Sequence, residues 1–201
     1  MEVYIEMIGI KEIEELEKAK DLMSWAHQGQ TRAKSGILYE IHPRRVAAMA
    51  AEHGFPHYAI IAMLWHDCAE DGPDIIKYNV NDLKCVAIEE YHISTETVNE
   101  ACKIVDSLTR YQHESKSEYI SRLTREGSDL AVLGKVLDRI DNLKDGETSM
   151  GDDWLARYSK STKKIIRMVE TRKLTDYACY QHLKNKLDLI ERYLDAKRTT
   201  E

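Results

Sequence analysis

Apolar residues recur at intervals of three and four along most of the chain, which is the period of amphipathic helices. Between residues 11 and 28, for example, Ile13, Leu16, Met23 and Ala26 follow that spacing. Strand-like alternation is nearly absent, and only 3 prolines and 9 glycines interrupt the 201 residues. The pattern predicts helices over residues 11–28, 43–53, 56–70, 80–91, 95–110, 115–125, 129–145, 152–171 and 173–197. The expected fold class is therefore all-α.

Proline and glycine mark several of the expected helix boundaries. Pro43 suits the first turn of a helix, where its missing N–H costs nothing, and Gly54 ends that helix. Pro56 opens the next helix, and Gly72 with the proline after it terminates it. No repeat or clear linker divides the chain, so one domain over residues 1–201 is expected. Its motif-bearing core covers about residues 11–146, and C-terminal helices follow over about 152–197.

The composition excludes several classes of protein. Hydrophobic residues make up 43% and charged residues 32%, which suits a globular domain. The net charge of −6 gives no basic stripe for nucleic acid, and no apolar run approaches the roughly 20 residues of a membrane span. The acidic N-terminus fits neither a signal nor a transit peptide, so we expect a cytoplasmic protein without nucleic-acid or membrane partners. The four cysteines are far apart and are expected to be reduced thiols.

The stretch MLWHDCAED follows the apolar run YAIIA and places one imidazole and three carboxylates within six residues. On a helix, His66 and Asp67 would both reach one point just off its surface. An imidazole with a carboxylate is a usual ligand mixture for a divalent first-row metal. His42 and Asp138 also border apolar stretches, where an unpaired charge would be costly. The alternative is that His66 is a satisfied core histidine and the acids form a solvated face.

In order along the chain, these pieces resemble the HD superfamily of metal-dependent phosphohydrolases. The longer pattern resembles its alarmone hydrolase branch, the guanosine tetraphosphate hydrolases of SpoT, Rel and Mesh type. Three stretches carry the resemblance: AHQGQTRAKSGILYEIHPRRVAAM, HDCAED and VLDRIDNL, which together span residues 26–143. The resemblance implies an HD-domain helical bundle with a metal site between core helices.

The resemblance also implies roles for individual residues. Glu70 and Asp71 would be catalytic, orienting a metal-activated water or taking its proton, and Asn142 would face the nucleotide. The metal would be Mn²⁺ or another first-row divalent ion, one per chain. Its expected ligands are His42, His66, Asp67 and Asp138.

The loop before His42 is expected to bind the substrate. In the alarmone hydrolases an Arg of this loop packs on the guanine, and either Arg32 or Lys34 is its equivalent here. Tyr39 matches the family tyrosine that supports the nucleotide. The family's Glu-Pro pair is replaced by Ile37 and Leu38, which bears on guanine recognition but not on the metal chemistry.

Other polar positions are expected to be less specific. Asp141 falls where the family varies, so it is expected to be a solvated acid. Arg139 would either pair with an acid of the site or cover the helix. Arg157, Lys160 or Lys164 would reach a distal phosphate or form a basic solvated face. The six histidines outside the predicted ligand set are expected at the surface or as caps.

Three functions follow. The leading one is a stand-alone Mn²⁺-dependent hydrolase that removes the 3′-diphosphate of guanosine tetra- or pentaphosphate. The second is an HD-type nucleoside 5′-monophosphatase or deoxynucleoside triphosphate hydrolase, with the same metal ligands. The third is a nucleotide-binding or regulatory module without catalysis. A nucleotide is the expected partner in each, and a homo-oligomer is possible.

Overall fold

A computed structural model of the chain describes residues 9–32 and 35–198. Within these residues the regular structure is helical, apart from one isolated antiparallel bridge between Thr31 and Leu38. The helices are α1 (Ile10–Ala26), α2 (Ile41–Glu52), α3 (His57–Trp65), α4 (Cys68–Asp71), α5 (Val80–Glu89), α6 (Thr95–Leu108), α7 (Lys116–Glu126), α8 (Asp129–Ser149), α9 (Asp152–Thr171) and α10 (Ala178–Arg198). The prediction of an all-α fold is confirmed.

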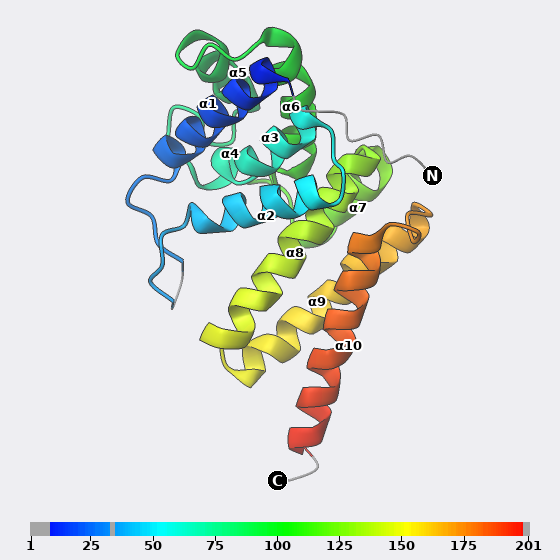
Figure 1. Cartoon of the computed structure of the whole chain (residues 1–201). Helices are drawn as coiled ribbons and strands as arrows, with labels where there is room; N and C mark the ends of the chain where they lie inside the picture. Colours follow the sequence, from blue (N-terminus) through cyan, green and yellow to red (C-terminus); the bar gives the residue numbers. More distant parts are fainter. Residues whose placement is uncertain (1–8, 33–34, 199–201) are drawn as a thin grey trace.

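Helix α3 forms the centre of the core. Every side chain from Ala59 to Trp65 is buried, as expected for a helix that is apolar on all sides. It packs against α1, α2 and α6 (Figure 1). The indole Nε1 of Trp65 donates a hydrogen bond of 3.0 Å to the carbonyl oxygen of Ala19, which joins α3 to α1. The C-terminal end of α3, and with it the start of the segment that follows, is therefore fixed relative to α1.

Helix α8 connects the N-terminal helices to the C-terminal ones. It runs diagonally through the molecule in Figure 1 and contacts α2, α6, α7, α9 and α10. Helices α9 and α10 also pack against each other beside the lower half of α8. Residues on α8 thus face both the end of α3 and the inner side of α9, and the site described below lies along this helix.

The prediction of a single helix over residues 56–70 is wrong. A turn at His66 and Asp67 divides this segment into α3 and α4. The ring Nδ1 of His66 donates to the carbonyl oxygen of Met63 at 2.8 Å. This side chain thereby competes for a carbonyl that a continuing helix would bond to the N–H four residues on. His66 and Asp67 are consequently not on one continuous helical face with Glu70 and Asp71.

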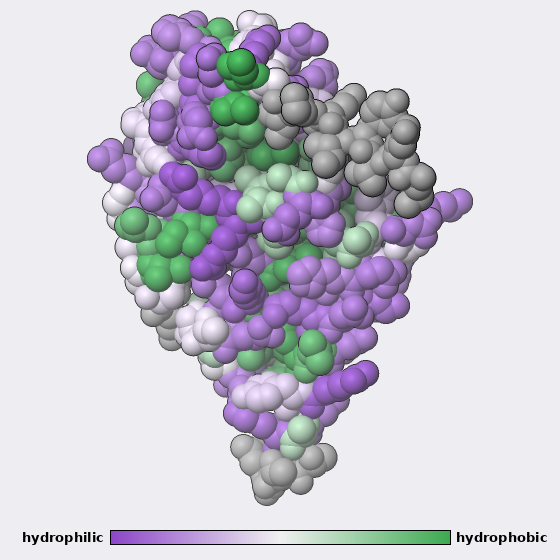
Figure 2. Space-filling view, in the orientation of Figure 1, coloured by the Kyte–Doolittle hydropathy of each residue, from purple (hydrophilic) through white to green (hydrophobic). Residues whose placement is uncertain are grey.

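The face of the molecule seen in Figure 2 is mostly hydrophilic, with small separate apolar patches. None of the helices in residues 9–32 and 35–198 combines the length and apolarity that crossing a bilayer requires. The large apolar side chains exposed in this part of the chain are Ile10, Ile13, Trp25, Leu38, Ile75, Tyr177, Leu189 and Tyr193.

Candidate metal centre

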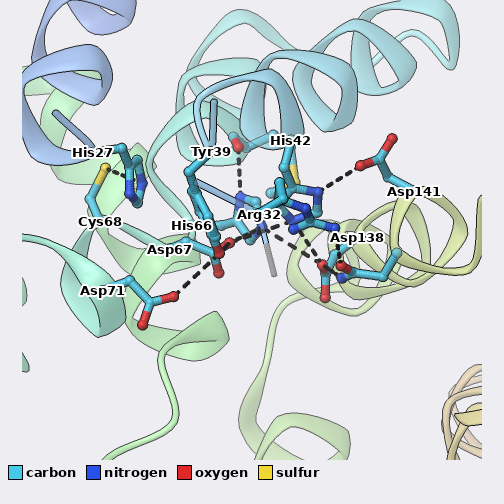
Figure 3. A network of polar contacts seen from close by, with 12 residues as sticks. His27, Arg32, Tyr39, His42, His66, Asp67, Cys68, Asp71, Asp138 and Asp141 are labelled. Atoms are coloured by element: carbon cyan, nitrogen blue, oxygen red, sulfur yellow. Dashed lines mark hydrogen bonds and ion pairs between the residues drawn. The ribbon is translucent and has the colours of Figure 1, made fainter. Parts of the chain in front are cut away.

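Four polar side chains from three parts of the chain converge at one point (Figure 3). His42 comes from α2, His66 and Asp67 from the turn after α3, and Asp138 from α8. His42 Nε2 lies 3.4 Å from Asp67 Oδ2 and 3.2 Å from Asp138 Oδ1. His66 Nε2 lies 3.3 Å and 3.8 Å from the same two oxygens. The structure thus brings together all four residues that the sequence predicted as metal ligands.

Both imidazoles present Nε2 to this cluster because Nδ1 is bonded elsewhere. His42 Nδ1 lies 2.7 Å from Asp141 Oδ2, and His66 Nδ1 lies 2.8 Å from the Met63 carbonyl oxygen. Both partners only accept hydrogen bonds, so each Nδ1 carries a proton. His66 Nε2 is buried and has no hydrogen-bond partner within the described part of the chain, a state that costs about 1–3 kcal/mol. Two imidazole nitrogens facing two carboxylate oxygens fit a divalent first-row metal.

Both carboxylate oxygens of Asp138 interact with neighbouring side chains of α8. Asn142 Nδ2 donates to Oδ1 at 2.5 Å, and Lys135 Nζ forms an ion pair with Oδ2 at 2.8 Å. Asn142, which the resemblance predicts to face the nucleotide, therefore lies beside the cluster and contacts a predicted ligand. Lys135 was not anticipated. Its position three residues before Asp138, in the apolar run VLGKVL, was the available clue.

The charges of the cluster stabilise one another. Burial alone would raise the pKa of Asp67, but the charge on His66 and a hydrogen bond with His42 lower it below its usual range. The pKa of Asp138 is likewise held low, against its burial, first by the charge on Lys135 and then by the nearby imidazoles. Burial would lower the pKa of His42, but hydrogen bonds with three carboxylates raise it well above its usual value. Both carboxylates are therefore ionised and available to a cation.

The two predicted catalytic acids lie next to the cluster. Burial raises the pKa of Glu70, whose Oε1 accepts the backbone N–H of Arg110 at 2.6 Å. Burial and the nearby charge of Asp67 raise the pKa of Asp71. The hydroxyl of Tyr39 lies 2.8 Å from Asp67 Oδ2 and 3.2 Å from Asp71 Oδ2, so it links a predicted ligand to a predicted catalytic acid.

The loop before α2 brings Arg32 to the same place (Figure 3). Its guanidinium lies over the ring of Tyr39, 5.5 Å from the centroid, and Nη2 donates to Asn142 Oδ1 at 2.8 Å. Nε bonds to Asp145 Oδ2 at 3.1 Å. A cavity of about 200 Å³ opens here, and Trp154 is among the residues that line it. Lys34, the other predicted candidate, lies outside the described residues.

A second cavity, of about 480 Å³, adjoins the cluster between α7, α8 and α9. Its wall includes Glu70 and the ring of Trp154, which stacks on Tyr158 with centroids 4.3 Å apart. Arg139 lies 4.1 Å above the other side of the Tyr158 ring, and its buried Nε has no partner among the described atoms. Six cationic side chains line this cavity: Arg110, Lys116, Lys135, Arg139, Arg157 and Lys164. We call it the basic cavity; Lys160 does not line it.

One sequence expectation near the cluster is wrong. Asp141 is not solvated: it is 2% exposed and bonded to His42. His27 follows the last residue of α1 as a cap, as expected, and it is buried 4.7 Å from the Tyr39 ring. In VLDRIDNL both Asp138 and Asp141 directly follow an apolar residue, so a charge at either position requires a partner.

No protein-family model matches the chain. It is 31% identical over 137 residues to the guanosine-3′,5′-bis(diphosphate) 3′-pyrophosphohydrolase of Aquifex aeolicus (strain VF5). It is 32% identical over 168 residues to the enzyme of the same name from Haemophilus influenzae (strain ATCC 51907 / DSM 11121 / KW20 / Rd). The matches take in 65% and 81% of this chain but only 18% and 22% of the relatives. The chain therefore spans about a fifth of their length.

The fold also matches a solved structure of a metazoan ortholog of SpoT, a protein that hydrolyses ppGpp and plays a role in starvation responses. The match has a TM-score of 0.62 and 23% sequence identity, and it covers 92% of this chain and 96% of the other. The predicted resemblance to SpoT-type hydrolases is thus confirmed in sequence, and the predicted helical architecture is confirmed in fold.

Proposed function

We propose that this chain is a metal-dependent pyrophosphohydrolase that removes the 3′-diphosphate of guanosine tetra- or pentaphosphate. One observation carries the proposal: a cluster with the donor set of a divalent metal opens beside a cavity lined by six cations and a single acid, Glu70. In a chain of net charge −6, such a concentration of positive charge indicates an anionic ligand. The names of the sequence relatives supply the substrate class.

His42, His66, Asp67 and Asp138 would hold the metal, for which we propose Mn²⁺. Bound there, the ion would lower the pKa of a coordinated water and offset the charge of the reacting phosphate. Four protein ligands fit this role because an octahedral ion then keeps positions for water and substrate.

Glu70 and Asp71 would orient the attacking water and accept its proton. A general base works best when its pKa lies near the working pH. Burial moves both carboxyls in that direction by raising their pKa values. Glu70 lines the basic cavity, where the diphosphate would lie, and is the better placed of the two. The water would attack the phosphorus bonded to the 3′ oxygen, and the bond between these two atoms would break. The water oxygen would become part of the released pyrophosphate, and the 3′ oxygen would take up the proton that the base accepted and become a hydroxyl.

Arg139, Arg157 and Lys164 would bind the phosphates. The buried Nε of Arg139 has no partner within the described segments, and its guanidinium is already oriented by the Tyr158 ring and by a 2.8 Å bond to Ser161 Oγ. A donor held in this way loses little entropy when a phosphate oxygen binds, which favours charge stabilisation.

Arg32, Tyr39 and Asn142 would bind the nucleoside part. The guanidinium and the phenol ring already stack, and their cavity shares Trp154 with the basic cavity. A nucleotide could thus extend from the first cavity into the second. The alternative, an HD-type 5′-monophosphatase or deoxynucleoside triphosphate hydrolase, is kept because Ile37 and Leu38 replace the family's Glu-Pro.

We further propose one domain over residues 1–201, a cytoplasmic location and a nucleotide substrate, with neither nucleic acid nor membrane as a partner. A homo-oligomer is compatible with these proposals.

Product analysis tests the function directly. The protein with Mn²⁺ would be incubated separately with guanosine tetraphosphate, deoxynucleoside triphosphates and 5′-monophosphates, and the products separated by ion exchange. We expect guanosine diphosphate and pyrophosphate from the first substrate alone. Orthophosphate from a monophosphate, or triphosphate from a deoxynucleotide, would reject the alarmone and support the alternative. Asp67→Ala serves as the inactive control.

A further inference from the structure

The two imidazoles of the metal centre differ in what holds them. His66 Nδ1 bonds to a main-chain carbonyl, whereas His42 Nδ1 bonds to the carboxylate of Asp141 at 2.7 Å. We propose that Asp141 is a positioning residue for the metal: it fixes the tautomer of His42 that binds a cation and makes His42 a stronger ligand. This inference rests on the proposed metal site and adds a residue to it.

The surroundings of Asp141 indicate that His42 is its main partner. The carboxylate is 2% exposed, so its charge has lost nearly all contact with water. Arg45 Nη1 lies 3.7 Å from Asp141 Oδ1, which is beyond hydrogen-bond distance, and the arginine side chain is 41% exposed. The bond to His42 has the length of a charge-assisted hydrogen bond. A buried acid is costly without such a partner, so an apolar residue would suit this position better if it only had to pack.

The chemistry of the two rings explains why a carboxylate matters. A histidine that binds a metal through Nε2 must carry its proton on Nδ1. An ionised carboxylate only accepts hydrogen bonds, so Asp141 admits that tautomer alone. Its negative charge also increases the electron density of the imidazole, and outer partners of this kind are typically worth 10–100-fold in metal affinity.

An amide at the same position behaves differently. The NH₂ group of an asparagine can donate to an unprotonated Nδ1, which moves the ring proton to Nε2, the atom that should bind the metal. Such a change of tautomer abolishes much of the function of a histidine while leaving the geometry intact. Asp141→Asn therefore preserves shape and removes only the property that we invoke.

The test measures Mn²⁺ binding to the full chain by isothermal titration calorimetry. We expect Asp141→Asn to weaken binding about 10–100-fold. Asp129→Asn is the matched control: Asp129 also lies on α8 and pairs with Arg172 at 2.6 Å, at the end remote from the cluster. It should change stability slightly and leave Mn²⁺ affinity within about twofold, the range of a surface substitution.

A second readout separates positioning from a general loss of structure. In the Zn²⁺-loaded protein, imidazole-selected ¹H–¹⁵N spectra should show His42 protonated at Nδ1, with its proton shifted to low field by the carboxylate. Asp141→Asn should lose that shift while His66 keeps its own signal. Equal Mn²⁺ affinities for Asp141→Asn and the unsubstituted chain would overturn this inference and leave the metal site standing. Absence of Mn²⁺ binding by the unsubstituted chain would overturn the proposed function as well.

Discussion

Lys135 is partly buried beside the candidate metal centre, and its replacement by methionine tests whether this lysine balances the charge of Asp138. Its Nζ lies 2.8 Å from Asp138 Oδ2, and the two side chains are 18% and 8% exposed. Methionine keeps most of the volume and the apolar stem of lysine, so the substitution removes the charge with little change in packing.

The size of the effect follows from this geometry. With an effective dielectric constant of about 20, Coulomb's law gives roughly 6 kcal/mol for unit charges at that distance. Removing the lysine also removes its own desolvation penalty, and measured losses of one partner from a buried pair are about 3–5 kcal/mol. Because Lys135 borders the basic cavity, we expect Lys135→Met to lower the free energy of unfolding by about 3 kcal/mol, near the lower end of that range. For a chain of this length, that loss of unfolding free energy lowers Tm by roughly 6–12 °C.

Thermal unfolding in a chelating buffer measures the loss, with Lys103→Met as the matched control. Lys103 has the same spacing to its acid, Glu100, at 2.5 Å, but the side chains are 69% and 44% exposed. An exposed pair contributes about 0–1 kcal/mol, so the control should lower Tm by no more than about 2–4 °C. Saturating Mn²⁺ should reduce the difference in Tm between Lys135→Met and the unsubstituted chain, because the ion supplies positive charge to Asp138. Equal Tm values for the two variants in chelator would refute the reasoning.

Three further predictions concern single carboxylates. Asp67→Ala should abolish both bound Mn²⁺, measured by elemental analysis, and turnover; full activity of a metal-free preparation would contradict the metal mechanism. Glu70→Gln should retain Mn²⁺ but slow turnover by about 10²–10⁴-fold, the usual contribution of a general base, and unchanged turnover would remove Glu70 from this role. Glu15 joins α1 to α6, accepting from Ser94 N at 3.2 Å and Thr97 Oγ1 at 2.8 Å. Burial would raise the pKa of Glu15, but these hydrogen bonds lower it below its ordinary value of 4.5. The bonds therefore contribute their full stabilisation above pH 4.5, and this contribution is lost as the pH falls through the lowered pKa. Glu15→Gln should therefore lower the free energy of unfolding by about 1–2 kcal/mol at pH 7 in urea titrations, with a smaller deficit at pH 3; a deficit that is the same at both pH values would contradict this assignment.

The helical architecture was predictable because the apolar period and the helix-ending residues are local properties of the chain. Gly54 has a positive φ of 72° after α2, and the expected boundary there is correct. The break between α3 and α4 was not predictable in the same way. The residues around His66 and Asp67 are compatible with a continuous helix, and a side chain that bonds the Met63 carbonyl decides the outcome. The helix propensities of the individual residues do not predict this hydrogen bond.

The candidate metal ligands were identifiable because each is a polar residue at the edge of an apolar segment. The same argument applies to Asp141 and Lys135, but the family pattern varies at Asp141 and does not include Lys135, so the resemblance singles out neither. The basic cavity could not be derived at all. Its cations come from separate helices, and only the packing of α7 and α9 against α8 brings Lys116, Arg139 and Lys164 to one wall.

The charges on the two sides of α8 are complementary to different parts of one ligand. The metal cluster carries two ionised carboxylates, one of them paired with Lys135, and a metal ion bound by Nε2 of the two imidazoles would take the place of their protons. The basic cavity carries six cations and one acid, so it accepts negative charge. A divalent ion bound to a diphosphate presents both signs within a few ångströms. A monophosphate offers less charge to the cavity, and this difference is the physical reason to prefer a diphosphate substrate in the proposed reaction.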